Sequence, residues 1–88
     1  MSERQVAVAL RYREDSEAAP RVVAKGYGTV ADSIVRLAQQ HGVPLHRDED
    51  LARVLVQLDL NALIPPELYA AVAEVLAYIY RMNAAKTS

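Results

Sequence analysis

Large apolar side chains alternate with the smaller or polar residues Ala7, Ala9 and Arg11 at the start of the chain, from Gln5 to Tyr12. Because strand side chains point to opposite faces with a period of two, this segment predicts a strand with one apolar face. That face carries Val6, Val8, Leu10 and Tyr12. The polar connection that follows is too short for a crossover helix, so the next apolar run, Arg21 to Lys25, predicts a second, antiparallel strand that ends at Gly26.

From Val30 to His41, apolar residues recur at the three- and four-residue spacing of an amphipathic helix. Thr29, with Asp32 three residues later, is the expected N-cap, and Gly42 is expected to end the helix in a left-handed conformation. Val43 to His46 then predicts a short third strand. A strand, a helix and a strand in this order form a βαβ unit with parallel strands, so we expect a mixed sheet.

Asp48 is suited to cap a second, short helix. The apolar stripe of that helix is predicted to comprise Leu51, Val54, Leu55 and Leu58, with Arg53 and Gln57 facing outward. After a loop from Asp59 to Ile64, Pro66 is expected at the first position of the last and longest helix. The apolar face of the last helix comprises Leu68, Val72, Val75, Leu76, Ile79 and Met82.

Together these patterns predict an α/β fold, with a small mixed sheet of three to four strands packed by three to four helices. The domain is expected to span residues 5–82, and the polar segment 83–88 is expected to form a disordered tail. A chain of 88 residues is near the size at which a single hydrophobic core is barely sufficient, and a hydrophobic fraction of 52% favours such a core.

Charge and cysteine content restrict the possible partners. Ten basic and eleven acidic residues give a net charge of −1, without the basic stripe that is typical of nucleic-acid binding. Without Cys, neither a disulfide nor a thiolate zinc site is available. The most apolar stretch, Leu68 to Tyr80, contains Glu74 and is well short of the ~20 residues that span a bilayer. We expect a soluble, cytoplasmic monomer without a signal peptide or a membrane span.

One motif has the pattern of a phosphate-binding loop. Gly26, Gly28 and Ala31 match G-x-G-x-x-A between a strand and a helix, and Asp48 lies where a dinucleotide-binding fold places its ribose-binding acid. The chain has no second mononucleotide-binding half to complete the cofactor crevice, however, and the two glycines can equally serve to turn the chain from strand to helix. A small nucleotide-binding module is therefore the alternative function.

Metal binding and nucleophilic catalysis have little support in the sequence. His41 and His46, with Asp48 or Asp50, lie around a helix end and do not have a standard ligand spacing. Ser33 lies within a predicted helix, and no nearby sequence links it to a base and an orienting acid. We expect no metal, no cofactor and no enzymatic activity.

Several blocks of the sequence, taken together, resemble one family. These blocks are Ala7–Tyr12, Ala19–Gly26, Val43–Pro44, Leu51–Arg53 and Ile64–Tyr78. The combination resembles the cytosolic C-terminal domain of the flagellar and type III secretion export-switch proteins, FlhB and its virulence relatives, over roughly Val6 to Arg81. The resemblance implies a non-enzymatic cytoplasmic adaptor that binds export substrates or proteins of the export apparatus and can be recruited to that apparatus at the inner membrane.

In that family the domain changes the class of exported substrate from rod or needle components to later ones. The change is associated with self-cleavage at an Asn-Pro-Thr-His motif directly before the first strand, where this chain has Ser2-Glu3-Arg4-Gln5. Cleavage requires the Asn side chain to attack its own carbonyl and break the Asn-Pro bond, whereas Asn61 and Asn83 each precede Ala. The resemblance therefore implies a stand-alone paralogue that does not cleave itself and is already equivalent to the fragment after the cleavage point.

The resemblance also implies an apolar hollow between the turn before the second strand and the last helix. Carried over by position, Ala19 and Pro20 would face Ala73 and Leu76 across it, and export proteins would bind there. Ala73 and Leu76 are close to one helical turn apart, so they share a face. Ordinary core packing of the same four residues is the alternative interpretation.

Overall fold

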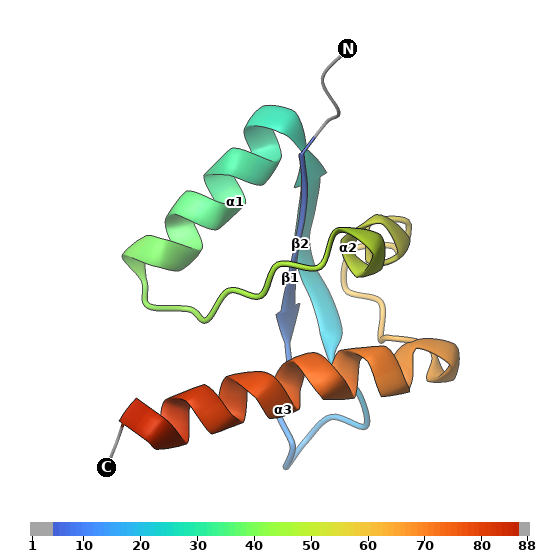
Figure 1. The fold of residues 1–88 in the computed structure, drawn as a ribbon. Coiled ribbons are helices and arrows are strands. Elements are labelled where there is room, and N and C mark those ends of the chain that lie inside the picture. The colour runs from blue at the N-terminus through green and yellow to red at the C-terminus, as the bar shows by residue number, and fades with distance from the viewer. Residues whose placement is uncertain (1–4, 87–88) are drawn as a thin grey trace.

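A computed structural model describes residues 5–86 of the chain, with side chains as far as Arg81. The elements in chain order are β1 (Val6–Arg11), β2 (Arg21–Tyr27), α1 (Gly28–Gln40), α2 (Glu49–Leu55), the 3-10 turn η1 (Pro66–Leu68) and α3 (Tyr69–Lys86). Figure 1 shows α1 and α2 on opposite sides of the two strands and α3 laid across one end of them. The α/β class and the helical packing agree with the sequence-based prediction.

The two strands are antiparallel, as predicted. Their register runs from Val6 opposite Tyr27 to Arg11 opposite Arg21, with one irregularity after Ala9. β2 continues through Gly26 to Tyr27 instead of ending at Gly26. A Cβ atom on Gly26 would lie 2.2 Å from a methyl carbon of Val30, so glycine is what lets the start of α1 pack this closely against β2.

The predicted third strand is absent, and with it the βαβ unit. Residues Val43 to His46 have no regular secondary structure and are exposed, and the sheet has two strands within the described part of the chain. The backbone N–H of Val43 donates to the Ala38 carbonyl (2.8 Å), which commits it to the end of α1. Pro44 has no N–H to give to a neighbouring strand. The segment therefore crosses from α1 to α2 as an extended linker (Figure 1).

The loop before η1 pairs instead with the start of β2. The N–H of Val22 donates to the Ala62 carbonyl (3.0 Å), and the N–H of Asn61 donates back to the Val22 carbonyl (2.7 Å). The N–H of Ile64 donates to the Pro20 carbonyl (2.8 Å). The segment predicted as an unpaired loop is therefore hydrogen-bonded to the sheet like a very short antiparallel strand.

Helix ends follow the sequence in two of three cases. Asp48 caps α2, because its side chain accepts a hydrogen bond from the N–H of Leu51 (3.1 Å). Gly42 has φ +68° after α1, the left-handed conformation that was predicted. Thr29 is not the N-cap of α1, since the chain passes directly from β2 into a helix that begins at Gly28 and has no side-chain cap.

The core lies where β2, α2, the loop before η1 and α3 meet. Its buried members are Val22, Leu55, Ile64 and Val72, against which Val8, Leu10, Leu51, Leu58, Leu68 and Leu76 pack. Val54 was predicted in the apolar stripe of α2 but is 46% exposed, and Val56 is buried instead. Val56 still has helical dihedral angles, and its N–H donates to the Ala52 carbonyl (2.9 Å), so it extends the last turn of α2.

Pro66 begins η1, and α3 continues from Tyr69 to Lys86, beyond the predicted domain end at residue 82. The division into a domain over residues 5–82 and a tail over residues 83–88 stays a prediction. Within the described residues, no helix is both long and apolar enough to cross a membrane.

Truncation of the core is expected to be costly in so small a domain. Ile64 is 1% exposed, whereas Leu60 in the same loop is 54% exposed. Ile64→Ala should lower the free energy of unfolding by about 3 kcal/mol, because it removes buried methyl groups and leaves a cavity. Urea unfolding followed by circular dichroism measures this, with Leu60→Ala as the matched control that stays within about 0.5 kcal/mol of wild type. Equal losses in the two variants would contradict the described core.

Candidate functional site

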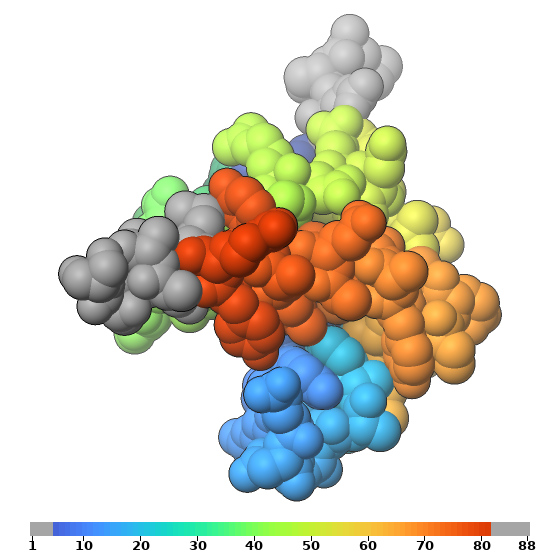
Figure 2. All heavy atoms as spheres, turned by 60° about the horizontal axis from the view of Figure 1, so that its bottom comes forward, coloured from blue at the N-terminus to red at the C-terminus, as the bar shows by residue number. Residues whose placement is uncertain are grey.

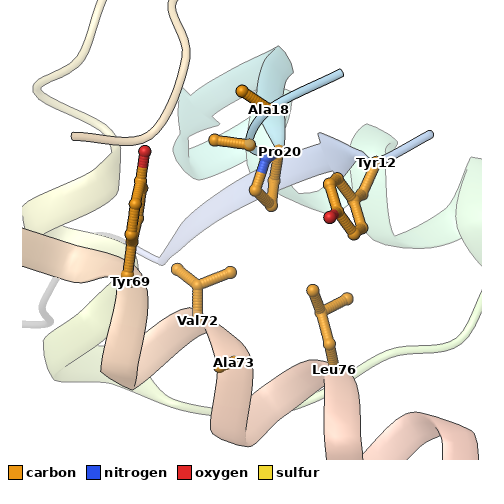
Figure 3. Close-up of a pocket in the computed structure, with 8 residues that line it drawn as sticks. Tyr12, Ala18, Pro20, Tyr69, Val72, Ala73 and Leu76 are labelled. Atoms are coloured by element: carbon orange, nitrogen blue, oxygen red, sulfur yellow. The ribbon is translucent and has the colours of Figure 1, made fainter. Parts of the chain in front are cut away.

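An apolar hollow of about 210 Å³ lies between α3 and the connection that joins the two strands. Its lining residues are Tyr12, Ala18, Ala19, Pro20, Tyr69, Val72, Ala73 and Leu76. Figure 3 shows Tyr12 and Pro20 facing the α3 side chains of Val72 and Leu76. The structure thus brings together all four residues that the resemblance placed at such a hollow.

The hollow has a buried floor and an open rim. Ala19 and Val72 are each 2% exposed and belong to the interior, whereas Ala73 is exposed and Leu76 is half-buried. Core packing therefore describes Ala19, whereas Ala73 borders open space, as expected of a binding hollow. Figure 2 shows the connection between the strands projecting beside α3.

Sequence reasoning missed half of the lining. The alternation of the first strand placed Tyr12 on the same face as Leu10 but did not indicate that it borders a hollow. Tyr69 and Val72 precede Ala73 and Leu76 at helical spacing, so the helical period places all four on one stripe of α3. Which stripe borders a hollow depends on where the strand connection lies, and no local pattern contains that information.

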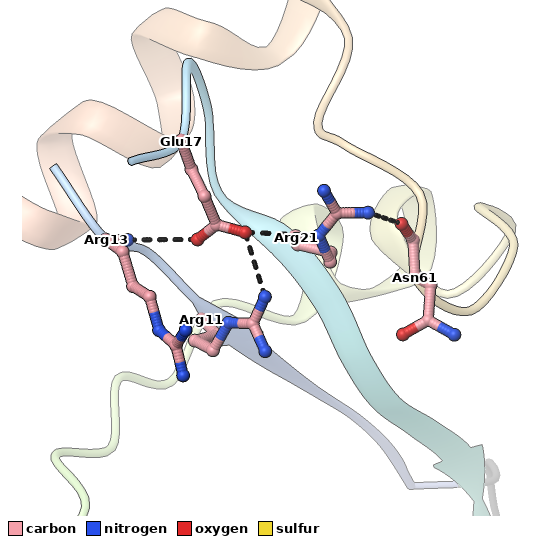
Figure 4. A network of polar contacts seen from close by, with 5 residues as sticks. All are labelled: Arg11, Arg13, Glu17, Arg21 and Asn61. Atoms are coloured by element: carbon pink, nitrogen blue, oxygen red, sulfur yellow. Dashed lines mark hydrogen bonds and ion pairs between the residues drawn. The ribbon is translucent and has the colours of Figure 1, made fainter. Parts of the chain in front are cut away.

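A polar network lies directly beside the hollow (Figure 4). The Glu17 carboxylate accepts hydrogen bonds from the Arg11 guanidinium (2.9 Å), the Arg21 guanidinium (3.2 Å) and the backbone N–H of Arg13 (3.1 Å). Arg21 also donates to the carbonyl of Asn61. The side chain of Glu17 is 9% exposed, so the carboxylate is largely enclosed by its cationic partners. These partners, Arg11 first, lower the pKa of Glu17 to about 2.

Lys25 of β2 joins the sheet to the segment that ends α2. The ammonium group of Lys25 donates to the carbonyl of Val56 (3.0 Å) and to that of Leu58 (2.6 Å). Both carbonyls follow the C-terminal end of α2, where the helix dipole favours a positive charge. Lys25 therefore has a structural role.

The glycine motif serves the turn from strand to helix. Gly26 lies within β2, Gly28 has φ +56° at the start of α1, and Ala31 is buried. Asp48, the expected ribose ligand, is engaged as the cap of α2. A dinucleotide crevice forms at the carboxyl ends of parallel strands, and this sheet is antiparallel. The geometry gives no support to a nucleotide-binding module.

His46 and Ser33 have structural partners, and His41 follows the last residue of α1 as its C-cap. The rings of His46 and Tyr78 meet edge to face at 5.4 Å, which places the linker before α2 against α3. The hydroxyl of Ser33 accepts a hydrogen bond from Arg36 (3.3 Å) one turn along α1. A search of the described residues finds no group of three His, Asp, Glu or Cys side chains that could hold a metal ion.

Because the pKa of Glu17 is low, the free energy of unfolding is expected to depend on pH in acid solution. Its pKa is about 2 in the folded chain against an ordinary value of 4.5, so the unfolded chain takes up this proton first. The contribution of Glu17 to stability is complete above pH 4.5 and is lost as the pH falls towards 2. In Glu17→Gln, the free energy of unfolding should fall less steeply over this window than in wild type. Glu14→Gln, an exposed position in the same connection, should keep the wild-type slope in urea titrations; a wild-type slope in Glu17→Gln is the contrary result.

Comparison with known sequences gives a family match over most of the chain. The model of the FlhB HrpN YscU SpaS family matches residues 4–79. The YlqH protein of Bacillus subtilis is 43% identical over 77 residues, covering 88% of this chain and 83% of YlqH. FlhB of Aquifex aeolicus, a flagellar biosynthetic protein, is 43% identical over 75 residues, covering 84% of this chain and 21% of FlhB. The chain therefore spans most of YlqH and a minor part of FlhB.

Solved structures show the same relationship at the level of the fold. The cytoplasmic domain of FlhB from Shewanella putrefaciens matches with a TM-score of 0.87 and 35% identity, over 93% of this chain and 64% of that domain. The PscU C-terminal domain matches with a TM-score of 0.80 and 33% identity, over 84% of this chain and 95% of that domain. The chain thus belongs to the FlhB HrpN YscU SpaS family of flagellar and type III export proteins and has the fold of their cytoplasmic C-terminal domains.

Proposed function

We propose that the chain is a non-enzymatic, cytoplasmic adaptor of a flagellar or type III export apparatus, and that its hollow receives an apolar side chain of an export protein. The observation that carries the proposal is the hollow itself, open to solvent at Ala73 and lined by the four residues that the family resemblance implied. Within the family, recruitment to the export apparatus at the inner membrane would bring this hollow to its substrates.

The lining supports an apolar guest. Among the described residues, those that line the hollow include no charged side chain, and their only polar side-chain atoms are the hydroxyl groups of Tyr12 and Tyr69. Its volume of about 210 Å³ is larger than the ~150 Å³ apolar cavity that suffices for a benzene ring. One large aliphatic or aromatic side chain therefore fits. Burial of one such side chain contributes about 1.5–3 kcal/mol, which suits brief contact with a substrate in transit.

The chain is not expected to cleave itself. The chemistry requires an Asn-Pro bond, and each Asn of the sequence precedes Ala. The matching positions, 2–4 together with Gln5, lie at or outside the start of the described residues. Intact-mass spectrometry after long incubation at neutral pH should find the same single mass as in a freshly purified sample. Two complementary fragments would contradict the prediction.

Placing a charge at the rim is expected to weaken binding without unfolding the domain. Ala73 is exposed, so Ala73→Asp adds a carboxylate at the mouth of the hollow and leaves the core intact. Binding of purified rod protein from the same export system should fall at least about tenfold, because an apolar guest would have to desolvate that carboxylate. Isothermal titration calorimetry measures the affinity, and circular dichroism checks the fold.

Ala70→Asp is the matched control for this experiment. Ala70 is exposed on the same helix and does not line the hollow, so its variant has the same charge and composition. It should bind rod protein like wild type. Equal affinity of the Ala73→Asp variant and wild type would remove the hollow from the proposal. Leu76→Asp is unsuitable, because Leu76 also packs against the core.

A further inference from the structure

Ala18, Ala19 and Pro20 form one wall of the hollow. The residues on either side of this wall form an ion pair with each other. Glu17 directly precedes this wall and Arg21 directly follows it, and the two side chains meet at 3.2 Å. The position of the wall is therefore tied to the geometry of a single carboxylate. Figure 4 shows the Glu17 carboxylate between the guanidinium groups of Arg11 and Arg21.

Arg11 and Arg21 are also direct partners across the two strands. Like charges opposite each other in a strand pair repel and destabilise the pairing. Glu17 offsets this repulsion by accepting a hydrogen bond from each guanidinium, at 2.9 Å from Arg11 and 3.2 Å from Arg21. Without the carboxylate, the strand ends nearest to the hollow would carry two adjacent positive charges and no acidic group between them.

The same network reaches the opposite wall. Arg21 donates to the carbonyl of Asn61, a residue held at φ +70° in the loop that leads to η1 and α3. The N–H of Ile64 in that loop donates to the carbonyl of Pro20 in the first wall (2.8 Å). Tyr69, which follows this loop and η1, lines the hollow from the side of α3. Glu17, Arg21 and Asn61 thus connect the two walls.

We propose that Glu17 is a positioning residue that sets the width of the hollow, and with it the size of the apolar side chain that the hollow admits. The proposal rests on the function proposed above for the hollow. Gln in place of Glu17 keeps the size of the side chain but lacks the charge between Arg11 and Arg21. The strand ends then separate, the Ala18–Pro20 wall moves away from α3, and discrimination between small and large guests declines.

The test compares guests of different size. Acetylated pentapeptide amides with Leu, Phe or Trp between glycines are titrated at pH 7 into the chain, and the methyl NMR signals of Val72 and Leu76 report binding. In wild type, the strongest and weakest peptides should differ about tenfold in affinity, equivalent to about 1.4 kcal/mol. In Glu17→Gln, this ratio should fall to about twofold, whereas the exposed control Glu14→Gln should keep the wild-type ratio.

A rescue variant separates positioning from general loss of stability. Arg11→Gln combined with Glu17→Gln removes the like-charge pair, so its affinity ratio should lie between those of wild type and Glu17→Gln. Circular dichroism checks that each variant is folded. If Glu17→Gln is unfolded, only the double variant is compared with wild type. A wild-type ratio in both variants overturns the role of Glu17 and leaves the hollow as a binding site. If wild type binds neither the peptides nor the rod protein, both proposals are overturned.

Discussion

Val22 lies at the centre of the core on which the rest of the structure depends. Its side chain is fully buried among Leu55, Ile64 and Val72, which come from α2, the loop before η1 and α3. Its backbone pairs with Leu10 of β1 on one side and with the 61–62 segment on the other. A two-stranded sheet is marginally stable in water by itself, so β1 and β2 depend on this shared core. Through Val22, this strand meets α2, the loop before η1 and α3 in one core.

The hollow is a consequence of the same arrangement. α3 is anchored by Val72 and crosses the end of the strands instead of covering a face of the sheet (Figure 1). The helix therefore meets the connection between β1 and β2 at an angle, and small residues on both sides, Ala18 and Ala73, leave the space between them unfilled. The binding proposed for an apolar side chain needs such a gap, which a fully interlocked core would close.

Polar groups hold the parts of the molecule that the small core does not reach. Glu17 joins the two strand ends through Arg11 and Arg21, and Lys25 binds the carbonyl groups after α2. Hydrogen bonds that involve a charged group are stronger than neutral ones and fix direction as well as distance. In a domain with so few buried side chains, such contacts specify how the loops and helix ends lie around the sheet.

Local patterns determined much of the chain. The alternation in Val6 to Arg11 specified β1, Asp48 specified the start of α2 through its side-chain oxygen, and Gly42 specified the end of α1. Of the apolar face predicted for the last helix, Leu68, Val72 and Leu76 meet the core, and the side chain of Met82 lies outside the described residues. These features depend on a few neighbouring residues, whose steric and hydrogen-bonding preferences are the same in most folds. The resemblance to the family added the positions of Ala19, Pro20, Ala73 and Leu76. Tertiary structure decided the rest, because the rest depends on contacts between segments far apart in sequence. Residues 61–64 pair with the start of β2, Val43–His46 crosses from α1 to α2 without regular secondary structure, and the hollow lies between the strand connection and α3.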